Sequence, residues 1–422
     1  MMSPSGKSQL RKRALKVAPI AALLTLLLTI HLYLSSTTKG SSSTSTTTTA
    51  ASHHKLSQAL PARAAGDTLL KSAAECDLFT GKWVRNPEGP YYTNETCNAI
   101  QEHQNCMKFG RPDTEYLKWK WKPDGCDLPL FRPDLFLEMM RGKSLAFVGD
   151  SVARNHMQSL LCLLSKVARP VETAEPTGKQ LWFRYKDYDF SICLFWAPYL
   201  VKTGSLDTTT GRPFDIYLDE PDDTWSSQVA QFNFVVISAG HWFFRPSYFH
   251  VNRTLSGCVY CPEPYEDIEH LLPSFIYRRA FHTAFSAINA AAGYSGVTFV
   301  RTLSPSHFEG GTFDHHGNCL RMSPVKRGEA ELEEREAEFH AIQLEELGIA
   351  GRAGRVNGGR FVLFDATMSL LLRPDGHPSK YGSPPGVKLV MRYDCVHWCL
   401  PGPIDAWNDF LQELLRREIQ DK

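Results

Sequence analysis

The 422-residue chain has almost no net charge, because 46 Lys and Arg residues offset 45 Asp and Glu residues to leave +1. A domain-wide positive field is therefore missing, which excludes nucleic acid as the expected partner. The chain also lacks internal repeats, and its Gly-rich stretch, residues 351–360, precedes an apolar run instead of opening a helix. That placement excludes a phosphate-binding loop and favours a mobile surface loop. The hydrophobic content of 43% is ample for a buried core.

Acidic residues are absent from residues 1–16, which carry five basic ones, and residues 17–34 are uncharged and mostly apolar. A run of this length spans about 27 Å as a helix, close to the thickness of a bilayer core. Because the basic residues only precede the run, residues 1–16 are expected to be a cytosolic tail and the rest luminal. The run is longer than a usual signal-peptide core and no clear A-x-A cleavage site directly follows it, so an uncleaved signal-anchor is favoured over a cleaved signal peptide. The sequence therefore predicts a single-pass type II membrane protein.

Residues 35–74 are predicted to form a luminal stem. Residues 35–52 are almost pure Ser and Thr, a composition that buries no core and is typical of flexible, O-glycosylated segments. Asn94-Glu95-Thr96 and Asn252-Arg253-Thr254 are N-glycosylation sequons, which fit a luminal location.

Eleven cysteines in a luminal chain predict disulfide bonds, and the odd count leaves at least one thiol unpaired. Zinc is the competing interpretation, because Cys258 and Cys261 have metal-ligand spacing and Cys395, His397 and Cys399 are potential further ligands. An oxidising compartment favours disulfides, so no bound metal is expected.

Residues 75–130 are rich in Trp, Pro, Gly and Cys and show few regular periods, which predicts a disulfide-tied, loop-rich module. Its tryptophans, Trp119 and Trp121 among them, have two interpretations: they stack on sugar rings, or they pack against the rest of the protein. Packing is favoured, because Trp side chains are usually mostly buried.

Residues 131–422 show the pattern of one α/β domain. Apolar runs predict buried strands of a parallel sheet at residues 144–148, 190–195, 234–238, 297–302 and 361–365. Helical periods cover residues 152–166, 268–291, 328–348 and 404–417. Alternating strands and helices predict a doubly wound fold, in which the functional site lies at the carboxyl ends of the strands.

Ser151 is a candidate nucleophile at such a strand end. The first predicted strand leads directly into Gly149-Asp150-Ser151, and an amphipathic helix follows. Free N–H groups and the helix dipole stabilise an anion there, so a serine attacks a carbonyl while its own amide holds the oxyanion. The plainer alternative is that Asp150 or Ser151 is an ordinary N-cap.

A candidate acid–base pair lies near the C-terminus, in Asp394-Cys395-Val396-His397. On one helical turn or in a tight loop, this spacing lets Asp394 hold the imidazole in one tautomer while its other nitrogen faces a reactant. Together with Ser151 on an α/β fold, the pair predicts a Ser-His-Asp triad.

Two motifs resemble the plant trichome-birefringence-like family of polysaccharide O-acetyltransferases. They are GDSVARNH at residues 149–156 and DCVHWCLPG at residues 394–402, followed by DAWN at residues 405–408. The resemblance covers residues 75–417 and implies an SGNH-hydrolase-like sheet flanked by helices, with the Cys/Trp-rich module packed on it. YYTNETC, HQNCMKFGRPD, KWKWKPDGCDLP, SHFEGG and LRPDGHPSKYG are most similar to the xyloglucan O-acetyltransferase branch.

The resemblance implies a role for each member of the triad. Ser151 is acetylated and then deacylated by a sugar hydroxyl, His397 acts as general base and then general acid, and Asp394 orients His397. The Gly-x-Asn-Asp motif of the hydrolases is missing after residues 234–238, where Ala239-Gly240-His241-Trp242 stands instead. Candidates for the oxyanion hole or its support are Gly149, Asp150, Asn155, Gly240 and His241.

Two further segments are expected near the same rim, residues 304–311 and residues 373–378. The second offers another Asp and His, at the wrong spacing for one helical turn, and is alternatively a scaffold loop; the first is alternatively a structural turn. Candidates for lining the substrate cleft are Arg154, Trp242, His307, Arg373, Asp375, His377 and Trp398.

The resemblance also implies the disulfide pairing, which ties the N-terminal module to the catalytic loop. The pairs are Cys76–Cys126, Cys97–Cys162, Cys106–Cys399 and Cys319–Cys395. Cys258 and Cys261 are then a local pair or unpaired, and Cys193, on a buried strand, is the remaining thiol.

These observations predict a Golgi membrane O-acetyltransferase that modifies xyloglucan through an acetyl-Ser151 intermediate. It needs an acetyl donor, acetyl-CoA or an acetylated carrier, and no bound cofactor. Xylan and mannan are alternative acceptors. The alternative functions are an acetylesterase of the same fold and a non-catalytic protein that binds cell-wall polysaccharide.

Overall fold

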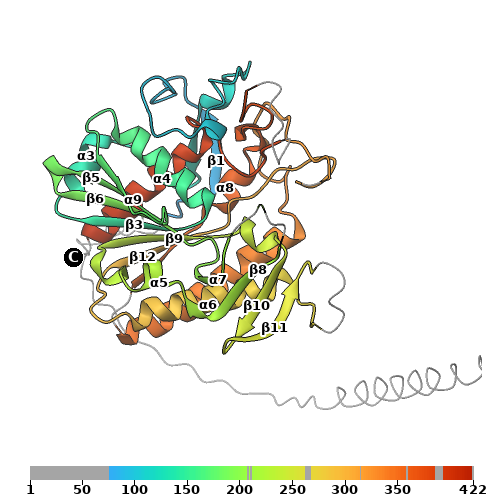
Figure 1. Cartoon of the computed structure of the whole chain (residues 1–422). Helices are drawn as coiled ribbons and strands as arrows, with labels where there is room; N and C mark the ends of the chain where they lie inside the picture. The colour runs from blue at the N-terminus through green and yellow to red at the C-terminus, as the bar shows by residue number, and fades with distance from the viewer. Residues whose placement is uncertain are drawn as a thin grey trace, which may run out of the picture. The chain divides into compact units, whose positions relative to one another are not determined.

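The computed structural model (Figure 1) describes the chain over residues 76–206, 209, 212–261, 268–313, 315–357, 360–384 and 393–420. The predicted tail, signal-anchor and stem, residues 1–74, lie outside these ranges. Among the residues that are described, no helix is both long and apolar enough to cross a membrane.

A seven-stranded sheet forms the centre of the α/β domain, in the order β13-β12-β9-β3-β6-β5-β4. Five strands confirm the predicted apolar runs and pair in parallel with one another: β3 (Ser144–Gly149), β6 (Phe190–Trp196), β9 (Phe234–Ser238), β12 (Val297–Arg301) and β13 (Arg360–Phe364).

The prediction of a purely parallel sheet is wrong at one edge. There β5 (Gln180–Tyr185) and β4 (Val171–Ala174) add to β6 in antiparallel orientation. Every residue of β4 is exposed, so this edge strand carries no apolar run that would have indicated it.

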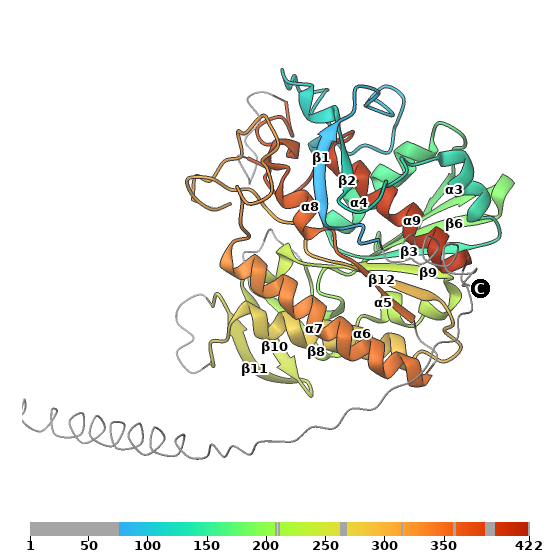
Figure 2. The same cartoon turned by 180° about the vertical axis from the view of Figure 1, so that it is seen from behind.

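Helices cover both faces of the sheet. Along β3, Leu145 and Phe147 pack in one core cluster with α4 and α9, whereas Ala146 and Val148 pack in a second cluster with α6 and α7. Alternate residues of a strand point to opposite faces, and Figures 1 and 2 show the two helix layers on either side. The helices are α3 (Pro133–Met139), α4 (Ser151–Leu164), α5 (Asp223–Ser226), α6 (Pro273–Ala290), α7 (Glu334–Asn357), α8 (Thr367–Leu371) and α9 (Ala406–Gln420).

Helix α7 continues through most of the Gly-rich stretch that was expected to form a mobile loop. It ends at Asn357, and residues 358 and 359 lie outside the described part. Glycine costs a helix about 1 kcal/mol relative to alanine. Packing along α6 offsets that cost, for example where Asn289 donates a hydrogen bond to the carbonyl oxygen of Ala350 at 3.1 Å.

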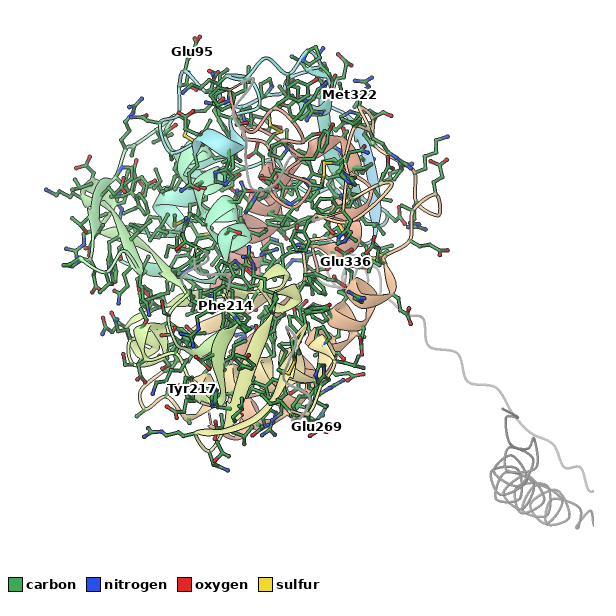
Figure 3. All side chains as sticks on the ribbon, turned by 45° about the vertical axis from the view of Figure 1, so that its right-hand side comes forward. Glu95, Phe214, Tyr217, Glu269, Met322 and Glu336 are labelled. Atoms are coloured by element: carbon green, nitrogen blue, oxygen red, sulfur yellow. A yellow bond between two sulfur atoms is a disulfide. The ribbon has the colours of Figure 1, made fainter. Side chains whose placement is uncertain are left out.

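A second, four-stranded sheet, in the order β11-β10-β8-β7, was not predicted. Its longest strand alternates buried and half-buried residues, so it contains no continuous apolar run. Figure 3 labels Phe214 and Tyr217 on this strand and Glu336 at the start of α7. The strands are β7 (Val201–Thr203), β8 (Phe214–Pro221), β10 (Ser247–Val251) and β11 (Thr254–Val259).

The N-terminal module contains two antiparallel strands, β1 (Gly81–Arg85) and β2 (Trp119–Pro123), with Trp83 paired opposite Trp121. Both indoles are buried, and the N–H group of Trp83 donates to the carbonyl oxygen of Ser369 in the α/β domain at 2.8 Å. The packing interpretation therefore holds for Trp121, which is 3% exposed.

The four disulfides implied by the resemblance are present: Cys76–Cys126, Cys97–Cys162, Cys106–Cys399 and Cys319–Cys395. Cys258 and Cys261 form a fifth, and Cys193 is a buried free thiol. The zinc interpretation is wrong, because each cysteine that it invoked is in a disulfide.

Candidate active site

Ser151 is the first residue of α4 and directly follows β3 through Asp150. The chain places β6 on one side of β3 and β9 on the other, so the carboxyl end of β3 is a switch point of the kind at which α/β sheets bind ligands. Gly149 permits this turn: its φ is 155°, and a side chain there would overlap the carbonyl oxygen of Ser238.

Asp150 holds the turn that leads into Ser151 in place. Its Oδ1 atom accepts hydrogen bonds from the amides of Val152 at 2.9 Å and Ala153 at 3.3 Å, so the N-cap interpretation is correct for this residue. Its Oδ2 atom accepts from the amide of Gly240 at 3.1 Å, which fixes the loop after β9 against α4.

Asp394 and His397 form the expected pair. Nδ1 of His397 donates to Oδ2 of Asp394 at 2.8 Å, and Oδ1 accepts from the amides of His397 at 3.0 Å and Val396 at 3.2 Å. This bonding fixes the tautomer, so Nε2 of His397 carries a lone pair. Nε2 is buried without a hydrogen-bond partner among the described residues.

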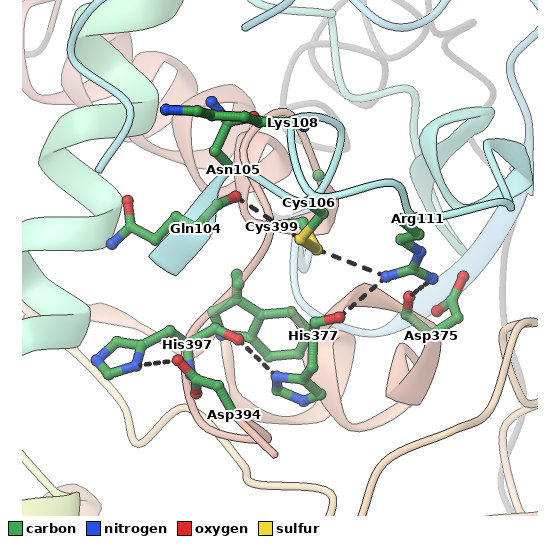
Figure 4. The surroundings of a disulfide bond; sticks show 12 residues. Gln104, Asn105, Cys106, Lys108, Arg111, Asp375, His377, Asp394, His397 and Cys399 are labelled. Atoms are coloured by element: carbon green, nitrogen blue, oxygen red, sulfur yellow. Dashed lines mark hydrogen bonds and ion pairs between the residues drawn. A yellow bond between two sulfur atoms is a disulfide. The ribbon is translucent and has the colours of Figure 1, made fainter. Parts of the chain in front are cut away.

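The loop of residues 394–402, which carries Asp394 and His397 and is called the catalytic loop here, is hydrogen-bonded to several other elements. The carbonyl oxygen of His397 accepts from Nδ1 of His377 at 2.7 Å, and the amide of Trp398 donates to Oδ1 of Asn155 at 2.8 Å. The amide of Leu400 donates to the carbonyl oxygen of Gln104 in the N-terminal module at 2.9 Å. Figure 4 shows the Asp394–His397 pair beside the Cys106–Cys399 disulfide.

Electrostatics within the pair favour a charged imidazole. Burial lowers the pKa of His397, but the charge and hydrogen bond of Asp394 outweigh burial, and the net pKa is raised above the ordinary 6.5. Burial raises the pKa of Asp394, and interactions with His397 reverse that effect, so the carboxyl stays ionised. Asp394 thereby stabilises the imidazolium that forms when His397 accepts a proton.

Ser151 and His397 open onto one cavity of about 380 Å³. Its wall combines aromatic side chains with two arginines and two glutamates. The lining residues are Ser151, His241, Trp242, Phe244, Arg245, Pro246, Tyr260, Ser306, Phe308, Gly311, Thr312, Phe313, Glu333, Arg335, Glu336, Val396 and His397.

Three of the candidate oxyanion donors are already engaged. The amide of Gly240 donates to Asp150, and the side-chain amide of Asn155 is bonded to the backbone of Trp398 on both its atoms. Burial lowers the pKa of His241, and the neutral ring donates from Nε2 to the carbonyl oxygen of Ser304 at 2.8 Å. Asp150 and Asn155 therefore have supporting roles.

A cation lies one helical turn beyond the nucleophile. The guanidinium of Arg154 stacks on the ring of Trp196 at 4.6 Å, and its Nε atom is buried without a hydrogen-bond partner among the described residues. Burial lowers the pKa of Arg154, and Asp150 partly opposes this shift. The backbone amide of Ser151 has no partner within the helix, because Ser151 is its first residue.

The sequence of the whole domain matches a known family. Residues 128–414 match PC-Esterase, described as a GDSL/SGNH-like acyl-esterase family found in Pmr5 and Cas1p, and residues 74–127 match the PMR5 N-terminal domain. The chain belongs to the PC-esterase family. The PC-esterase domain thus carries Ser151, Asp394 and His397, and the PMR5 N-terminal domain carries the two-stranded module.

Named relatives of this PC-esterase protein cover most of its length. Protein trichome birefringence-like 19 of Arabidopsis thaliana is 50% identical over 84% of this chain and 84% of that protein. Xyloglucan O-acetyltransferase 2 of Arabidopsis thaliana is 41% identical over 81% and 83%, and xyloglucan O-acetyltransferase 4 of Populus trichocarpa is 42% identical over 82% and 82%. The protein is an acyltransferase of a plant polysaccharide O-acetyltransferase family.

Several residues expected to line the cleft lie inside the PC-esterase domain instead. Arg373, Asp375, His377 and Trp398 are at most 1% exposed. Arg373 forms a two-pronged ion pair with Asp375, at 2.8 and 2.9 Å, and donates to the carbonyl oxygen of Tyr116 at 2.7 Å. These bonds tie Nε and Nη2 of Arg373 to internal partners, while Nη1 is buried without a partner among the described residues. Residues 373–378 therefore fit the scaffold-loop alternative.

His307 has a similar supporting position. Its Nδ1 lies 2.7 Å from Nε2 of His377, and its Nε2 lies 3.0 Å from the carbonyl oxygen of Leu371. Among the residues expected in the cleft, Trp242 is the one on the cavity wall.

Most residues of the cavity wall were not predicted from the sequence. Arg245 stacks on Trp242 at 4.3 Å, and Arg335 donates to the hydroxyl of Tyr260 at 2.9 Å. Glu336 accepts from the amide and hydroxyl of Ser306 at 2.8 and 2.7 Å, and burial raises its pKa to about 7. These residues lie in loops and at helix or strand ends far apart in sequence, so no local motif marked them.

Proposed function

We propose that the protein transfers an acetyl group from a donor to a hydroxyl of xyloglucan, through an acetyl ester on Ser151. The observation that carries this proposal is the shared cavity, which Ser151 and His397 both line, with His397 held by Asp394 and its Nε2 without a partner among the described residues. Two relatives named as xyloglucan O-acetyltransferases support the choice of acceptor.

The first half-reaction forms the acyl-enzyme. Nε2 of His397 takes the hydroxyl proton of Ser151 while Oγ attacks the acetyl carbonyl of the donor, and the carbonyl oxygen becomes an oxyanion. The amide of Ser151, which has no intrahelical partner, stabilises that charge. When the tetrahedral adduct collapses, the donor's leaving group takes the proton from His397.

The second half-reaction reverses these roles with a different nucleophile. His397 removes the proton of a sugar hydroxyl, whose oxygen attacks the acetyl carbon. Collapse breaks the bond to Oγ of Ser151, which recovers its proton from His397. The products are acetylated sugar and free enzyme.

Aromatic side chains on the cavity wall suit a carbohydrate acceptor. Trp242, Tyr260, Phe308 and Phe313 present rings beside polar groups that can bond hydroxyls, as expected of a largely apolar pocket with a few orienting groups. The same rings limit access of water, which competes with the sugar for the acyl-enzyme. The donor in this scheme is acetyl-CoA or an acetylated carrier, and no metal takes part.

We place the enzyme in the Golgi membrane, with residues 17–34 as signal-anchor and the catalytic domain in the lumen. The disulfides support an oxidising compartment. Asn252 is exposed in the turn between β10 and β11, which suits N-glycosylation there.

The decisive experiment incubates the protein with acetyl donor and xyloglucan oligosaccharide and measures acetylated product and free acetate by mass analysis. Ser151→Ala is expected to lose transfer by at least about 10³-fold, whereas Ser165→Ala, at the far end of α4, retains it. Wild-type rates in Ser151→Ala would refute the acyl-serine route.

The acceptor and the reaction type are tested with a panel of xyloglucan, xylan and mannan oligosaccharides. Preferential acetylation of xyloglucan is expected. Acetylation of xylan or mannan instead would reassign the acceptor, and release of acetate without acetylated glycan would make the protein an esterase. Sugar binding without either product would indicate a binding protein.

A further inference from the structure

We propose that His103, in the N-terminal module, is a positioning residue for the catalytic His397. Their rings meet edge to face, with centroids 4.9 Å apart and planes at 74°. The inference rests on the proposed role of His397 as general base. It gives the N-terminal module a part in the chemistry of the neighbouring domain.

Two bonds directly after the two histidines hold their segments together. Cys106, three residues after His103, is bonded covalently to Cys399, two residues after His397. The carbonyl oxygen of Gln104 accepts from the amide of Leu400 at 2.9 Å. The segment carrying His103 is therefore held against the catalytic loop at its backbone and through a disulfide (Figure 4).

Arg111 strengthens the same junction from the module. Its guanidinium donates to the carbonyl oxygens of Asp375 at 2.5 Å and His377 at 2.9 Å. His377 in turn donates to the carbonyl oxygen of His397, so module and catalytic loop share one hydrogen-bonded chain. A rigid frame of this kind is what an aromatic contact needs in order to define a ring orientation.

His397 needs such support because its side chain has a single hydrogen bond, from Nδ1 to Asp394, while Nε2 has no partner among the described residues. The ring must keep Nε2 directed at Ser151 through two proton transfers. An edge-to-face contact restricts rotation of the ring without occupying either nitrogen. Misplacement of a catalytic group by about 1 Å costs on the order of 100-fold in rate.

The charge state of His103 suits this role. Burial, then repulsion by His397 and Arg154, lowers its pKa to about 4 against a partial opposing effect of Asp394. A neutral ring does not draw the carboxylate of Asp394 away from His397. His103 is not among the residues that line the described cavity, so it acts through His397 and not on substrate.

The first test compares His103→Ala with His103→Phe in the full chain. Alanine removes the edge contact and is expected to lower kcat about 10- to 100-fold with little change in KM. Phenylalanine keeps a ring in place and is expected to stay within about 3-fold of wild type. His340→Ala is the control, because His340 is a half-buried histidine outside the cavity, where it is bonded to Asp365. Wild-type kcat in His103→Ala would overturn the proposal.

The second test asks whether His103 acts through His397. In a His397→Ala background, His103→Ala is expected to lower the residual rate no further, since residues that act as a unit are not additive. His103→Lys adds a cation beside the imidazole and is expected to move the acid limb of kcat/KM down by about one pH unit. Additive losses or an unmoved limb would assign His103 a merely structural role.

The experiments separate failure of this inference from failure of the proposed function. If His397→Ala keeps activity, the proposed function fails; if it is inactive while His103→Ala is normal, only the positioning role fails.

His103, Asp394 and His397 also place ligand atoms within 4.8 Å of one another, a spacing that a divalent metal would need. Activity is expected to survive EDTA, and loss that Zn²⁺ restores would overturn positioning in favour of a metal site.

Discussion

At the scale of single residues, the site depends on one carboxylate in a buried position. One carboxylate oxygen of Asp394 accepts a hydrogen bond from Nδ1 of His397, and the other accepts from two backbone amides. Those amides stabilise the ionised carboxyl, and the carboxyl raises the pKa of the imidazole. Burial alone would have had the opposite effect on both groups. The pair is therefore set to accept and return one proton.

This balance predicts the acid limb of the pH profile. In the proposed mechanism His397 acts as a base only when neutral, and its raised pKa keeps it protonated to higher pH, so kcat/KM is expected to fall below a midpoint above 6.5. Asp394→Asn removes the negative charge and should move that midpoint down while lowering kcat about 10³- to 10⁴-fold. Steady-state rates from pH 4 to 9 measure both; a midpoint unmoved by Asp394→Asn would contradict the role of this carboxylate.

At the scale of elements, two acids are buried at the start of helix α9, where the N-terminal module joins the domain: Asp405, which directly precedes the helix, and Asp409 within it. Asp409 accepts from the amide of Phe131 at 2.7 Å, and Asp405 accepts from the hydroxyls of Tyr92 at 2.7 Å and Ser159 at 2.5 Å. Burial raises the pKa of Asp409 to about 8 and that of Asp405 to about 6, although these hydrogen bonds oppose it. The folded state thus favours the protonated carboxyls.

The raised pKa values of Asp405 and Asp409 predict how the stability of the fold changes with pH. A carboxyl with a higher pKa in the folded state than its ordinary 3.8 contributes stability that is full at low pH and is lost as pH rises through the folded value. The melting temperature is expected to fall between pH 5 and about 8, and Asp409→Asn should flatten that decline. Calorimetry at several pH values measures it, with Asp134→Asn, an exposed acid, as control. An equal decline in both variants would argue against Asp409.

At the scale of the whole molecule, one disulfide closes the longest loop. Cys106–Cys399 joins residues separated by 293 positions and links the PMR5 N-terminal domain to the catalytic loop, whereas Cys258–Cys261 spans only three positions. A bond that closes a long loop restricts the unfolded chain more than one that closes a short loop. The first bond therefore supports both stability and the geometry of the site.

Replacing the two pairs separately tests this difference. Cys106→Ala with Cys399→Ala is expected to lower the free energy of unfolding by about 2–5 kcal/mol and to reduce kcat. The native Cys258–Cys261 bond closes only a short loop, so Cys258→Ala with Cys261→Ala should lower the free energy of unfolding by less. Chemical denaturation and the transfer assay measure the two effects. Equal stability losses in the two double variants would show that loop length is not what matters.

The sequence by itself determined the parts of this protein that depend on local pattern. Continuous apolar runs predicted five parallel strands, because strands covered by helices on both faces are mostly apolar. The strand–Gly-Asp-Ser–helix order placed Ser151, and the spacing of Asp394 and His397 allowed their hydrogen bond within one tight turn. The antiparallel edge of the central sheet and the second sheet were not predicted, because an exposed strand such as β4 has no apolar run.

Only the tertiary structure decided which residues meet across long separations in the chain. It buried Arg373 and Trp398, which were expected in the cleft, and bonded them to internal partners, Asp375 and Ser304. It brought Arg245, Tyr260 and Arg335 to the cavity from separate elements. It also set His103 against His397, for which the implied Cys106–Cys399 bond was the one indication in the sequence. Side-chain contacts of this kind follow from packing of distant segments, which no local period encodes.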